Sequence, residues 1–344
     1  MTKPLAELTT LRVGGTPREL HECRSLPDLV STARTVWESD ERWLLLGGGS
    51  NLVVADEPFD GSVIHVATSG IDHVEGDESR IRVQAGEPWD SVVAYAVERG
   101  LAGVEALSGI PGSAGAAPIQ NVGAYGQEVS ETLTNVDFLD YDTRELERLS
   151  NDELGFGYRT SVLKRGRKGV VVGIELQLEP STLSRPIAYA QLATSLGVSL
   201  GDRVPLAEVR DAVLALRASK GMVLSVDDPD SVSAGSFFTN PIVSERFAHG
   251  LPTDAPRWLL DPDAPESEVK LSAAWLIERS GITRGFSLPG SNAAISSKHT
   301  LAIVNRGGAT AEEIMQLARF VHLRVLGQFG VNLYPEPQLV GVTL

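Results

Sequence analysis

The residues best suited to binding chemistry lie in a glycine-rich stretch from Ser108 to Gly126. Most of its residues are small, and its glycines are Gly109, Gly112, Gly115, Gly123 and Gly126. Such a segment cannot build a core, but it can bring backbone N–H groups close to a flat or anionic ligand, because glycine lacks a Cβ. The stretch is therefore a candidate cradle for a large phosphate-bearing cofactor. The alternative is a pair of tight turns that joins two strands.

A second backbone-rich loop, Gly47-Gly-Gly-Ser-Asn51, directly follows a predicted buried strand over 43–46. No Lys-Ser or Lys-Thr pair follows, so it is not a Walker loop, and it lacks the Gly-x-Gly-x-x-Gly spacing of a dinucleotide-binding fold. A hairpin turn is the simpler alternative, although one glycine would suffice for that turn. Three consecutive glycines favour contact with a phosphate group.

Cations that could meet an anionic ligand stand out at two places. Arg159 lies in Gly155-Phe-Gly-Tyr-Arg159 and could clamp a carboxylate or a phosphate. Its alternative is a surface arginine in a loop. Arg217 and Lys220 end a helix predicted over 205–220, where they either complement the helix dipole or point at a ligand beyond the helix end.

Two further candidates lie in the C-terminal third of the chain. Ser236 belongs to Ser233-Ala-Gly-Ser-Phe-Phe-Thr-Asn-Pro241, an unusual turn with paired aromatic residues. Its alternative is a strand end whose phenylalanines fill the core. Glu336, near the C-terminus, would by itself be an ordinary solvated carboxylate.

Composition narrows the classes of protein. The 344 residues are 42% hydrophobic and 22% charged, which is typical of a globular enzyme of two or three domains. The net charge of −15 argues against a nucleic-acid partner. Cys23 is the only cysteine, so an intrachain disulfide and a cysteine-based metal site are excluded, and no metal is expected. Without a signal peptide or an apolar run of about 20 residues, we expect a cytoplasmic protein that does not engage a membrane.

The elements that must position these residues follow from hydrophobic periodicity and from cap and turn residues. Helices are predicted over 26–37, 88–100, 205–220 and 270–281, with a fifth that begins at a Thr310–Glu313 capping box and ends at Gly327 or Gly330. Strands are predicted from a Gly14-Gly15 turn to residue 23 and over 43–46, 52–55, 62–67, 81–85, 136–141, 170–178 and 301–304. Residues 223–233 and 252–268 are predicted loops. The pattern indicates an α+β fold with helices interspersed among mixed strands.

Together these motifs resemble those of the bacterial UDP-N-acetylenolpyruvoylglucosamine reductases, flavoenzymes of peptidoglycan (cell wall) synthesis. The matching pieces run in family order across almost the whole chain. They are Thr9-Thr-Leu-Arg-Val-Gly-Gly15, Gly47–Asn51, Gly109-Ile-Pro-Gly-Ser-Ala-Gly115, Ile119-Gln-Asn-Val-Gly-Ala-Tyr-Gly126, Tyr158-Arg-Thr-Ser161, Ala234–Pro241 and Pro335-Glu336.

The resemblance implies a three-domain α+β flavoenzyme with PCMH-type FAD-binding architecture. Residues 1–70 with 339–344 would form the first FAD-binding subdomain, 71–221 the second, and 222–338 the substrate-binding domain. We expect a monomer. The resemblance assigns non-covalent FAD to Gly47, Gly48, Gly49, Ser50, Asn51, Gly109, Pro111, Gly112, Ser113, Gly115, Ile119, Gln120, Asn121, Gly123, Tyr125, Gly126 and Arg217.

The resemblance also implies a reaction. NADPH would reduce FAD, which would pass hydride to the enolpyruvyl double bond of UDP-N-acetylglucosamine enolpyruvate and yield UDP-N-acetylmuramate. Arg159 would stabilise the enolate-like charge, and Ser236 would donate the proton. Glu336 would act as an acid or orient Arg159. The substrate or NADPH, which use one site in turn, would contact Tyr158, Tyr189, Lys220 and Asn240.

Two details refine the resemblance. Residues 185–192 lie where one form of the family has a loop that closes over the substrate, so Tyr189 is assigned as the lid of that loop. Its alternative is a packed tyrosine. Many members follow the catalytic glutamate with Val and Arg, whereas this chain has Pro337-Gln338. Because proline removes a strand N–H, local strand pairing is in question here.

Two other functions stay open on the sequence. One is a different FAD-dependent oxidase or dehydrogenase with the same FAD-binding architecture. The histidines and Cys23 lie outside the glycine loops, which counts against covalent attachment of the flavin. The other is a flavin- or nucleotide-sugar-binding module without enzymatic activity, which would leave the motif positions of Arg159, Ser236 and Glu336 without a reason.

Overall fold

The computed structural model describes residues 2–260 and 267–344. The chain folds into two compact units, each with its own hydrophobic core. The first unit comprises residues 1–3, 17–49 and 60–223, and the second comprises 4–16, 50–59 and 224–344. Two short N-terminal segments therefore fold with the C-terminal third of the chain. The finer division into three domains remains a prediction.

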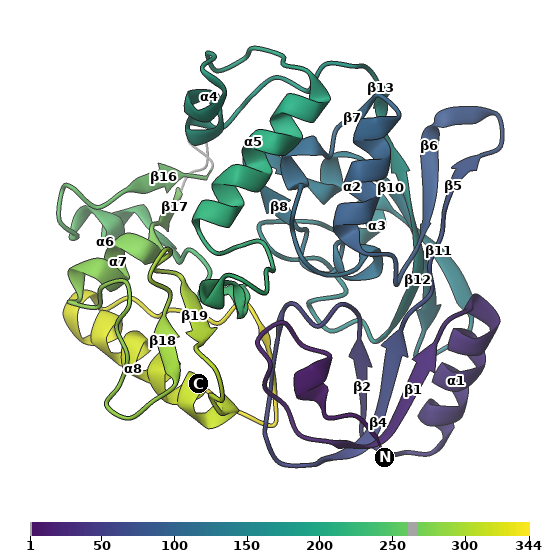
Figure 1. Ribbon diagram of the computed structural model, residues 1–344, viewed down its shortest axis with the longest axis horizontal. Helices are drawn as coiled ribbons and strands as arrows, with labels where there is room; N and C mark the ends of the chain where they lie inside the picture. The colour runs from purple at the N-terminus through teal and green to yellow at the C-terminus, as the bar shows by residue number, and fades with distance from the viewer. Residues whose placement is uncertain (1, 261–266) are drawn as a thin grey trace. The chain divides into compact units, whose positions relative to one another are not determined.

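Helices are interspersed among the strands of the first unit, and Figure 1 shows their arrangement. Its helices are α1 (Leu26–Glu38), α2 (Trp89–Glu98), α3 (Asn151–Leu154), α4 (Ala190–Leu196) and α5 (Leu206–Ser219). Its strands are β1 (Pro17–Cys23), β2 (Trp43–Leu46), β4 (Phe59–Val66), β5 (Ile71–Val74), β6 (Asp77–Gln84), β7 (Leu101–Ala102), β8 (Gly123–Ala124), β9 (Gln127–Glu128), β10 (Leu133–Asp140), β11 (Leu146–Ser150), β12 (Gly169–Gln177) and β13 (Glu179–Pro180).

Two sheets dominate the first unit. A five-stranded sheet has the order β11-β10-β12-β6-β5, and a three-stranded sheet has the order β1-β4-β2. The core between these elements includes fully buried Trp89 and Phe138. Helix α1 begins where the sequence predicts, because the Ser25 side chain accepts a hydrogen bond from Asp28 N.

The second unit combines small sheets with one long helix. Its strands are β3 (Leu52–Val54), β14 (Ser233–Ser236), β15 (Ile242–Ser244), β16 (Arg257–Leu259), β17 (Glu268–Leu271), β18 (Ala293–Ile295), β19 (Ala302–Asn305) and β20 (Gln338–Val340). Its helices are α6 (Glu245–His249), α7 (Ala273–Arg279) and α8 (Ala311–Phe329). The strand orders are β14-β19-β18, β15-β17-β16 and β20-β3.

Helix α8 covers one face of β18 and β19 (Figure 1). The predicted capping box is confirmed, since Thr310 and Glu313 bond each other's backbone N–H groups. Gly330, in the left-handed conformation with φ of 67°, ends the helix, so Gly327 does not. The mixed α/β content agrees with the fold class predicted from the sequence.

Two predictions about the second unit are wrong. The helix predicted over 270–281 begins only at Ala273, because Lys270 and Leu271 belong to β17 and Ser272 caps the helix by accepting from Trp275 N. The loop predicted over 252–268 contains β16, and its last residue, Glu268, begins β17. Residues 261–266 of that loop lie outside the described part of the chain.

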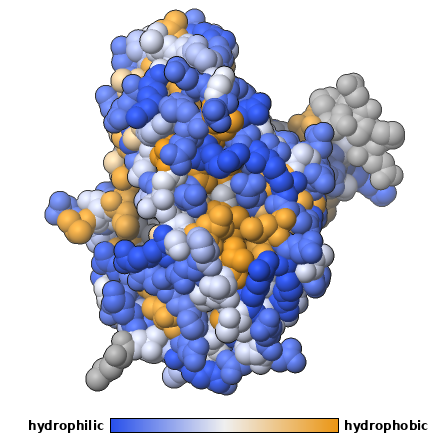
Figure 2. All heavy atoms as spheres, turned by 90° about the vertical axis from the view of Figure 1, so that its right-hand side faces the viewer, coloured by the Kyte–Doolittle hydropathy of each residue, from blue (hydrophilic) through white to orange (hydrophobic). Residues whose placement is uncertain are grey.

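The face shown in Figure 2 is mostly hydrophilic, with hydrophobic side chains gathered in smaller patches. Within residues 2–260 and 267–344, none of the helices combines the length and the apolar character needed to cross a bilayer.

Candidate active site

The two glycine-rich loops predicted to bind the cofactor contact each other in the first unit. A Cβ built on Gly48 would lie 2.7 Å from the Cα of Gly112, and one built on Gly47 would lie 2.5 Å from the Oγ of Ser113. Backbone therefore packs directly on backbone, and only glycine allows this approach. The structure joins Gly47–Gly49 and the 109–126 loop, 60 residues apart in sequence, into one surface of peptide groups.

The hairpin alternative for the 47–51 loop is excluded. Strand β2, which precedes the loop, pairs parallel with β4. Strand β3, which follows it, pairs parallel with β20 in the second unit. The loop therefore leads from one unit to the other, and Ser50 and Asn51 group with the second unit.

The 109–126 loop is fixed internally by Asn121, one of the predicted cofactor residues. Its amide donates to Glu128 Oε2 at 2.7 Å and to Gly157 O at 3.3 Å, and its Oδ1 accepts from Ser130 N. Asn121 and Tyr125 both have positive φ, of 46° and 49°. A buried side chain with these partners fixes the curvature of the loop, a role that the sequence does not reveal.

Arg159 lies against the same loop. Its Nη1 donates to Asn121 O at 3.1 Å, its Nη2 donates to Gly123 O, and Nη1 lies 3.6 Å from Glu128 Oε1. Its own φ is 51°, and its guanidinium lies 5.4 Å from the ring centroid of Tyr158. The side chain is thus held in one orientation by carbonyl oxygens of the glycine-rich loop. One predicted catalytic residue, Arg159, therefore contacts the predicted cofactor loop.

Three predicted ligand contacts gather around Tyr125, close to the end of the loop. The rings of Tyr125 and Tyr189 meet edge to face at 5.5 Å, and Lys220 Nζ lies 5.5 Å from the Tyr125 ring centroid. Lys220 also donates to Gln191 Oε1 at 2.7 Å. Burial, with the neighbouring charge of Arg217, lowers the pKa of Lys220. Burial raises the pKa of the Tyr125 phenol.

Arg217 provides the clearest sign of an anionic ligand in the first unit. Its Nη2 donates to Met222 O at 2.9 Å, whereas its Nε is buried and has no hydrogen-bond partner among the described residues. A Cβ on Gly109 would lie 3.6 Å from that Nε. Burial lowers the pKa of Arg217, yet a guanidinium stays charged in proteins. A buried cation with an unused donor fits a ligand that brings an acceptor.

Ser236 and Glu336 are brought together in the second unit. Ser236 ends β14, and the next residue, Phe237, donates to Leu301 O at 2.7 Å. Glu336 N donates in turn to Phe237 O at 2.9 Å. Phe237 and Phe238 are almost fully buried, as the core alternative for this turn predicts. The two phenylalanines therefore anchor the turn that carries Ser236 beside the backbone of Glu336.

Asn240 has a structural contact that the sequence did not indicate. Its Oδ1 accepts from Ala273 N at 3.0 Å, at the first residue of α7. The same side chain that was predicted to contact substrate thus also stabilises the start of a helix.

Two acidic residues near the glycine-rich loop were not found from the sequence. Asp90 Oδ1 accepts from Gly109 N at 2.6 Å, and both carboxylate oxygens bind Arg210, at 2.7 and 2.8 Å. Burial opposes ionisation of Asp90, but these hydrogen bonds outweigh it and lower its pKa. In sequence Asp90 resembles any acid in a first helical turn. Glu105, described below, precedes the loop and gives no sequence signal.

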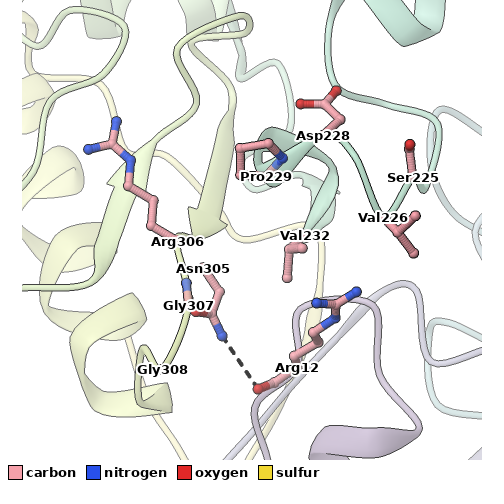
Figure 3. A pocket seen from close by; sticks show the side chains of 10 residues that line it. All are labelled: Arg12, Ser225, Val226, Asp228, Pro229, Val232, Asn305, Arg306, Gly307 and Gly308. Carbon is pink, nitrogen blue, oxygen red and sulfur yellow. Dashed lines mark hydrogen bonds between the residues drawn. The ribbon is translucent and has the colours of Figure 1, made fainter.

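A separate cavity of about 320 Å³ lies within the second unit (Figure 3). The side chain of Arg12, whose φ is 56°, points toward Val226 and Val232 in this view. Asn305 donates to Arg12 O at 3.4 Å and helps to hold this backbone conformation. None of the lining residues is a predicted site residue.

Comparison with known proteins covers the whole chain. A family model described as FAD binding domain matches residues 17–149, and one described as UDP-N-acetylenolpyruvoylglucosamine reductase, C-terminal domain, matches residues 228–340. The enzyme of that name from Leifsonia xyli is 57% identical, with 100% of both chains covered. The one from Thermobifida fusca is 51% identical over 99% of this chain and 98% of the relative.

A solved structure from the same family is also similar to this chain. The UDP-N-acetylenolpyruvylglucosamine reductase (MurB) from Thermus caldophilus matches with a TM-score of 0.66 and 26% identity, over 98% of this chain and 97% of that chain. The identity, the coverage and the domain matches agree with one another and with the motifs in the sequence. The chain belongs to the UDP-N-acetylenolpyruvoylglucosamine reductase family.

Proposed function

We propose that this chain uses FAD and NADPH to reduce the enolpyruvyl group of UDP-N-acetylglucosamine enolpyruvate, giving UDP-N-acetylmuramate for peptidoglycan synthesis. The observation that carries the proposal is the contact of Arg159 with the glycine-rich loop, in a chain that matches this family from end to end. A cation fixed by the peptide oxygens of a cofactor loop is suited to a carboxylate substrate.

The residues of the first unit fit FAD. The contact between Gly48 and Gly112 exposes peptide groups without side chains, and Arg217 adds a buried cation with an unused donor. Such surfaces bind phosphates and flat rings. When bound, FAD supplies hydride transfer between NADPH and the substrate.

Arg159 stabilises negative charge that develops on the carboxylate side of the enolpyruvyl group. Two of its nitrogens already donate to carbonyls of the loop, so the guanidinium does not have to reorganise during the reaction. Prior orientation is what makes such electrostatic stabilisation effective. Glu128, 3.6 Å from Nη1, further fixes the orientation.

Ser236 delivers the proton to the carbon that bears the carboxylate. A serine hydroxyl is a weak acid, so it must be held close to that carbon and aligned with it. The buried Phe237 and the bond from Glu336 N to Phe237 O fix the backbone next to Ser236. Glu336, on the paired segment, acts as a hydrogen-bonded acid or orients its neighbours.

Lys220 and Tyr189 bind the nucleotide part of the substrate, whereas Arg217 serves FAD. Lys220 is a partly buried cation, and such a cation favours an anionic group such as a diphosphate. Tyr158 and Asn240 complete the proposed substrate contacts. We expect the protein to act as a monomer, which light scattering of the purified protein would test.

The two half-reactions can be followed separately by flavin absorbance without oxygen. NADPH should bleach the bound flavin, and after removal of excess NADPH the enolpyruvyl sugar nucleotide should restore the colour. Ser236→Ala should slow only the second step, by roughly 100-fold or more, because it removes the proton donor. If the sugar nucleotide leaves the reduced flavin unchanged, the proposal fails and the oxidase alternative moves to first place.

A further inference from the structure

Glu105 is a buried carboxylate at the base of the glycine-rich loop. It lies in a 3₁₀ turn, Glu105–Leu107, and 1% of its surface is exposed. Three N–H donors surround it: Gly103 N at 2.6 Å from Oε2, and Gln127 Nε2 at 2.9 Å and Arg185 N at 2.8 Å from Oε1. A buried carboxylate is tolerated only where its oxygens accept such bonds, so these donors must stay in place.

The three donors come from three different segments. Gly103 lies before the glycine-rich loop, Gln127 comes directly after it, and Arg185 begins the segment that carries Tyr189. Gln127 also accepts a hydrogen bond from Ala106 N at 2.8 Å through its Oε1. Glu105 and Gln127 thus close the base of the loop, and the bond to Arg185 N attaches the segment 185–191 to that base.

The rest of the segment lies along the same loop. The Tyr189 ring meets Tyr125, and a Cβ on Gly126 would lie 2.9 Å from the Cβ of Ala188. The Arg185 guanidinium pairs with Glu131 at 3.0 Å, but both side chains are more than one-quarter exposed. Surface pairs of this kind contribute little, so the buried bond to Glu105 is the stronger of the two contacts of Arg185. Ile187 is separately bonded to Asp202 O at 2.9 Å, which lies outside the glycine-rich loop.

We propose that Glu105 is a positioning residue, which holds the 185–191 segment in register with the glycine-rich loop and so sets where Tyr189 meets the ligand. The identity of that ligand rests on the proposed function, but the attachment itself does not. Glu105 acts through the backbone of Arg185 and not by contact with the reacting groups.

An exchange of two side chains isolates the attachment. The double variant Glu105→Gln/Gln127→Glu keeps three of the four hydrogen bonds. The new amide at 105 can donate to the new carboxylate at 127, and its oxygen can still accept from Gly103 N. The new carboxylate at 127 can still accept from Ala106 N. Only Arg185 N then faces an N–H group instead of an oxygen. Glu105→Gln alone can turn its amide so that the oxygen still accepts from Gln127 Nε2 and Arg185 N, and only Gly103 N then faces an N–H group, so this variant should keep the attachment. Arg185→Ala is the matched control, since it removes the pair with Glu131 and keeps the backbone bond.

Two measurements test the proposal on the full-length holoenzyme. Without ligand, amide hydrogen exchange in the 185–191 segment should quicken about tenfold in the exchange variant and stay unchanged in β12 and in Arg185→Ala. With ligand, the KM for the enolpyruvyl sugar nucleotide should rise about tenfold, with a smaller change in kcat. Unchanged hydrogen exchange in the variant overturns the attachment, and faster exchange with an unchanged KM overturns the positioning role. If the wild type does not turn over this substrate, the proposed function fails, and hydrogen exchange alone decides the attachment.

Discussion

The side-chain amide of Asn51 donates a hydrogen bond to the main-chain oxygen of Glu336, at 3.3 Å and across 285 residues of sequence. The main-chain oxygen of Asn51 accepts from Gln338 N at 2.9 Å, and this bond begins the pairing of β3 with β20. The backbone N–H groups of Glu336 and Gln338 both donate hydrogen bonds, and Pro337, which has no N–H to donate, lies buried between them. Proline at 337 therefore leaves the local pairing intact, and a residue of the glycine loop fixes the segment of the predicted catalytic glutamate.

Asn51→Ala should therefore impair activity more than stability. Loss of one side-chain hydrogen bond costs about 1 kcal/mol of the free energy of unfolding. Displacement of Glu336 should lower kcat/KM by about tenfold, measured at matched flavin content. Asn151→Ala is a suitable control, since Asn151 also donates to main-chain oxygens, at 2.8 and 2.7 Å, and was not assigned to the site. Equal losses of kcat/KM in both variants would show that the Asn51 contact has no special role.

Substitution of alanine for glycine should have opposite effects on stability at Gly48, in the contact between the two glycine loops, and at Gly327, in α8. Gly48→Ala would place a methyl group 2.7 Å from the Gly112 Cα, so the loops must separate, and we expect a loss of about 1–3 kcal/mol together with a lower flavin content. Gly327 lies in α8, and a Cβ added there would meet no atom of another segment within 4 Å, so Gly327→Ala should stabilise the protein by about 0.5–1 kcal/mol. Thermal unfolding and the ratio of flavin to protein absorbance measure both. A Gly48→Ala protein with normal flavin content would contradict the role of this contact.

Local signals in the sequence account for much of the fold. The caps at Ser25 and at Thr310 with Glu313 set helix starts, because the stabilising partners lie within one turn. The start of α7 was misplaced because Leu271 fits the helical spacing, although Ser272 is a capping residue. Strand β16 could not be predicted from the sequence because it is short. Leu259 is also half exposed, so no alternation of apolar and polar residues indicates a buried face.

Long-range relationships could not be predicted in the same way. Two contacts join segments that are far apart in the chain, that of Gly48 with Gly112 and that of Asn51 with Glu336. A glycine or an asparagine in a sequence does not indicate which distant residue it will contact. The motifs indicated which residues to expect at the site, through the resemblance. They did not reveal Glu105 or Asp90, because a carboxylate that binds backbone N–H groups looks like a surface acid in sequence.

Asp90 should stabilise the first unit in a pH-dependent manner. Its pKa is lowered in the folded state, so its contribution is fully present above the pKa of the unfolded chain, about 4, and is lost as the pH falls through the folded value. Because the Asp90 side chain is 40% exposed, screening limits its contribution to about 1 kcal/mol. Urea unfolding of the wild type and of Asp90→Asn should therefore differ at pH 7 and converge toward pH 3. A difference that is constant over this range would mean that the Asp90 charge is not responsible.

Lys220 should set an alkaline limit to ligand binding. Burial and Arg217 lower its pKa, so it loses its charge at a lower pH than an ordinary lysine, and the affinity for an anionic sugar nucleotide should fall as the pH rises through that value. Lys220→Arg keeps the charge and should move the fall to higher pH. Lys220→Met should weaken binding about tenfold or more at pH 7 and abolish the fall, since a hydrogen bond to a charged group is lost. Titration of bound-flavin fluorescence between pH 7 and pH 10 measures all three proteins. If Lys220→Met keeps the same alkaline fall, another group titrates, and Lys220 does not set the limit.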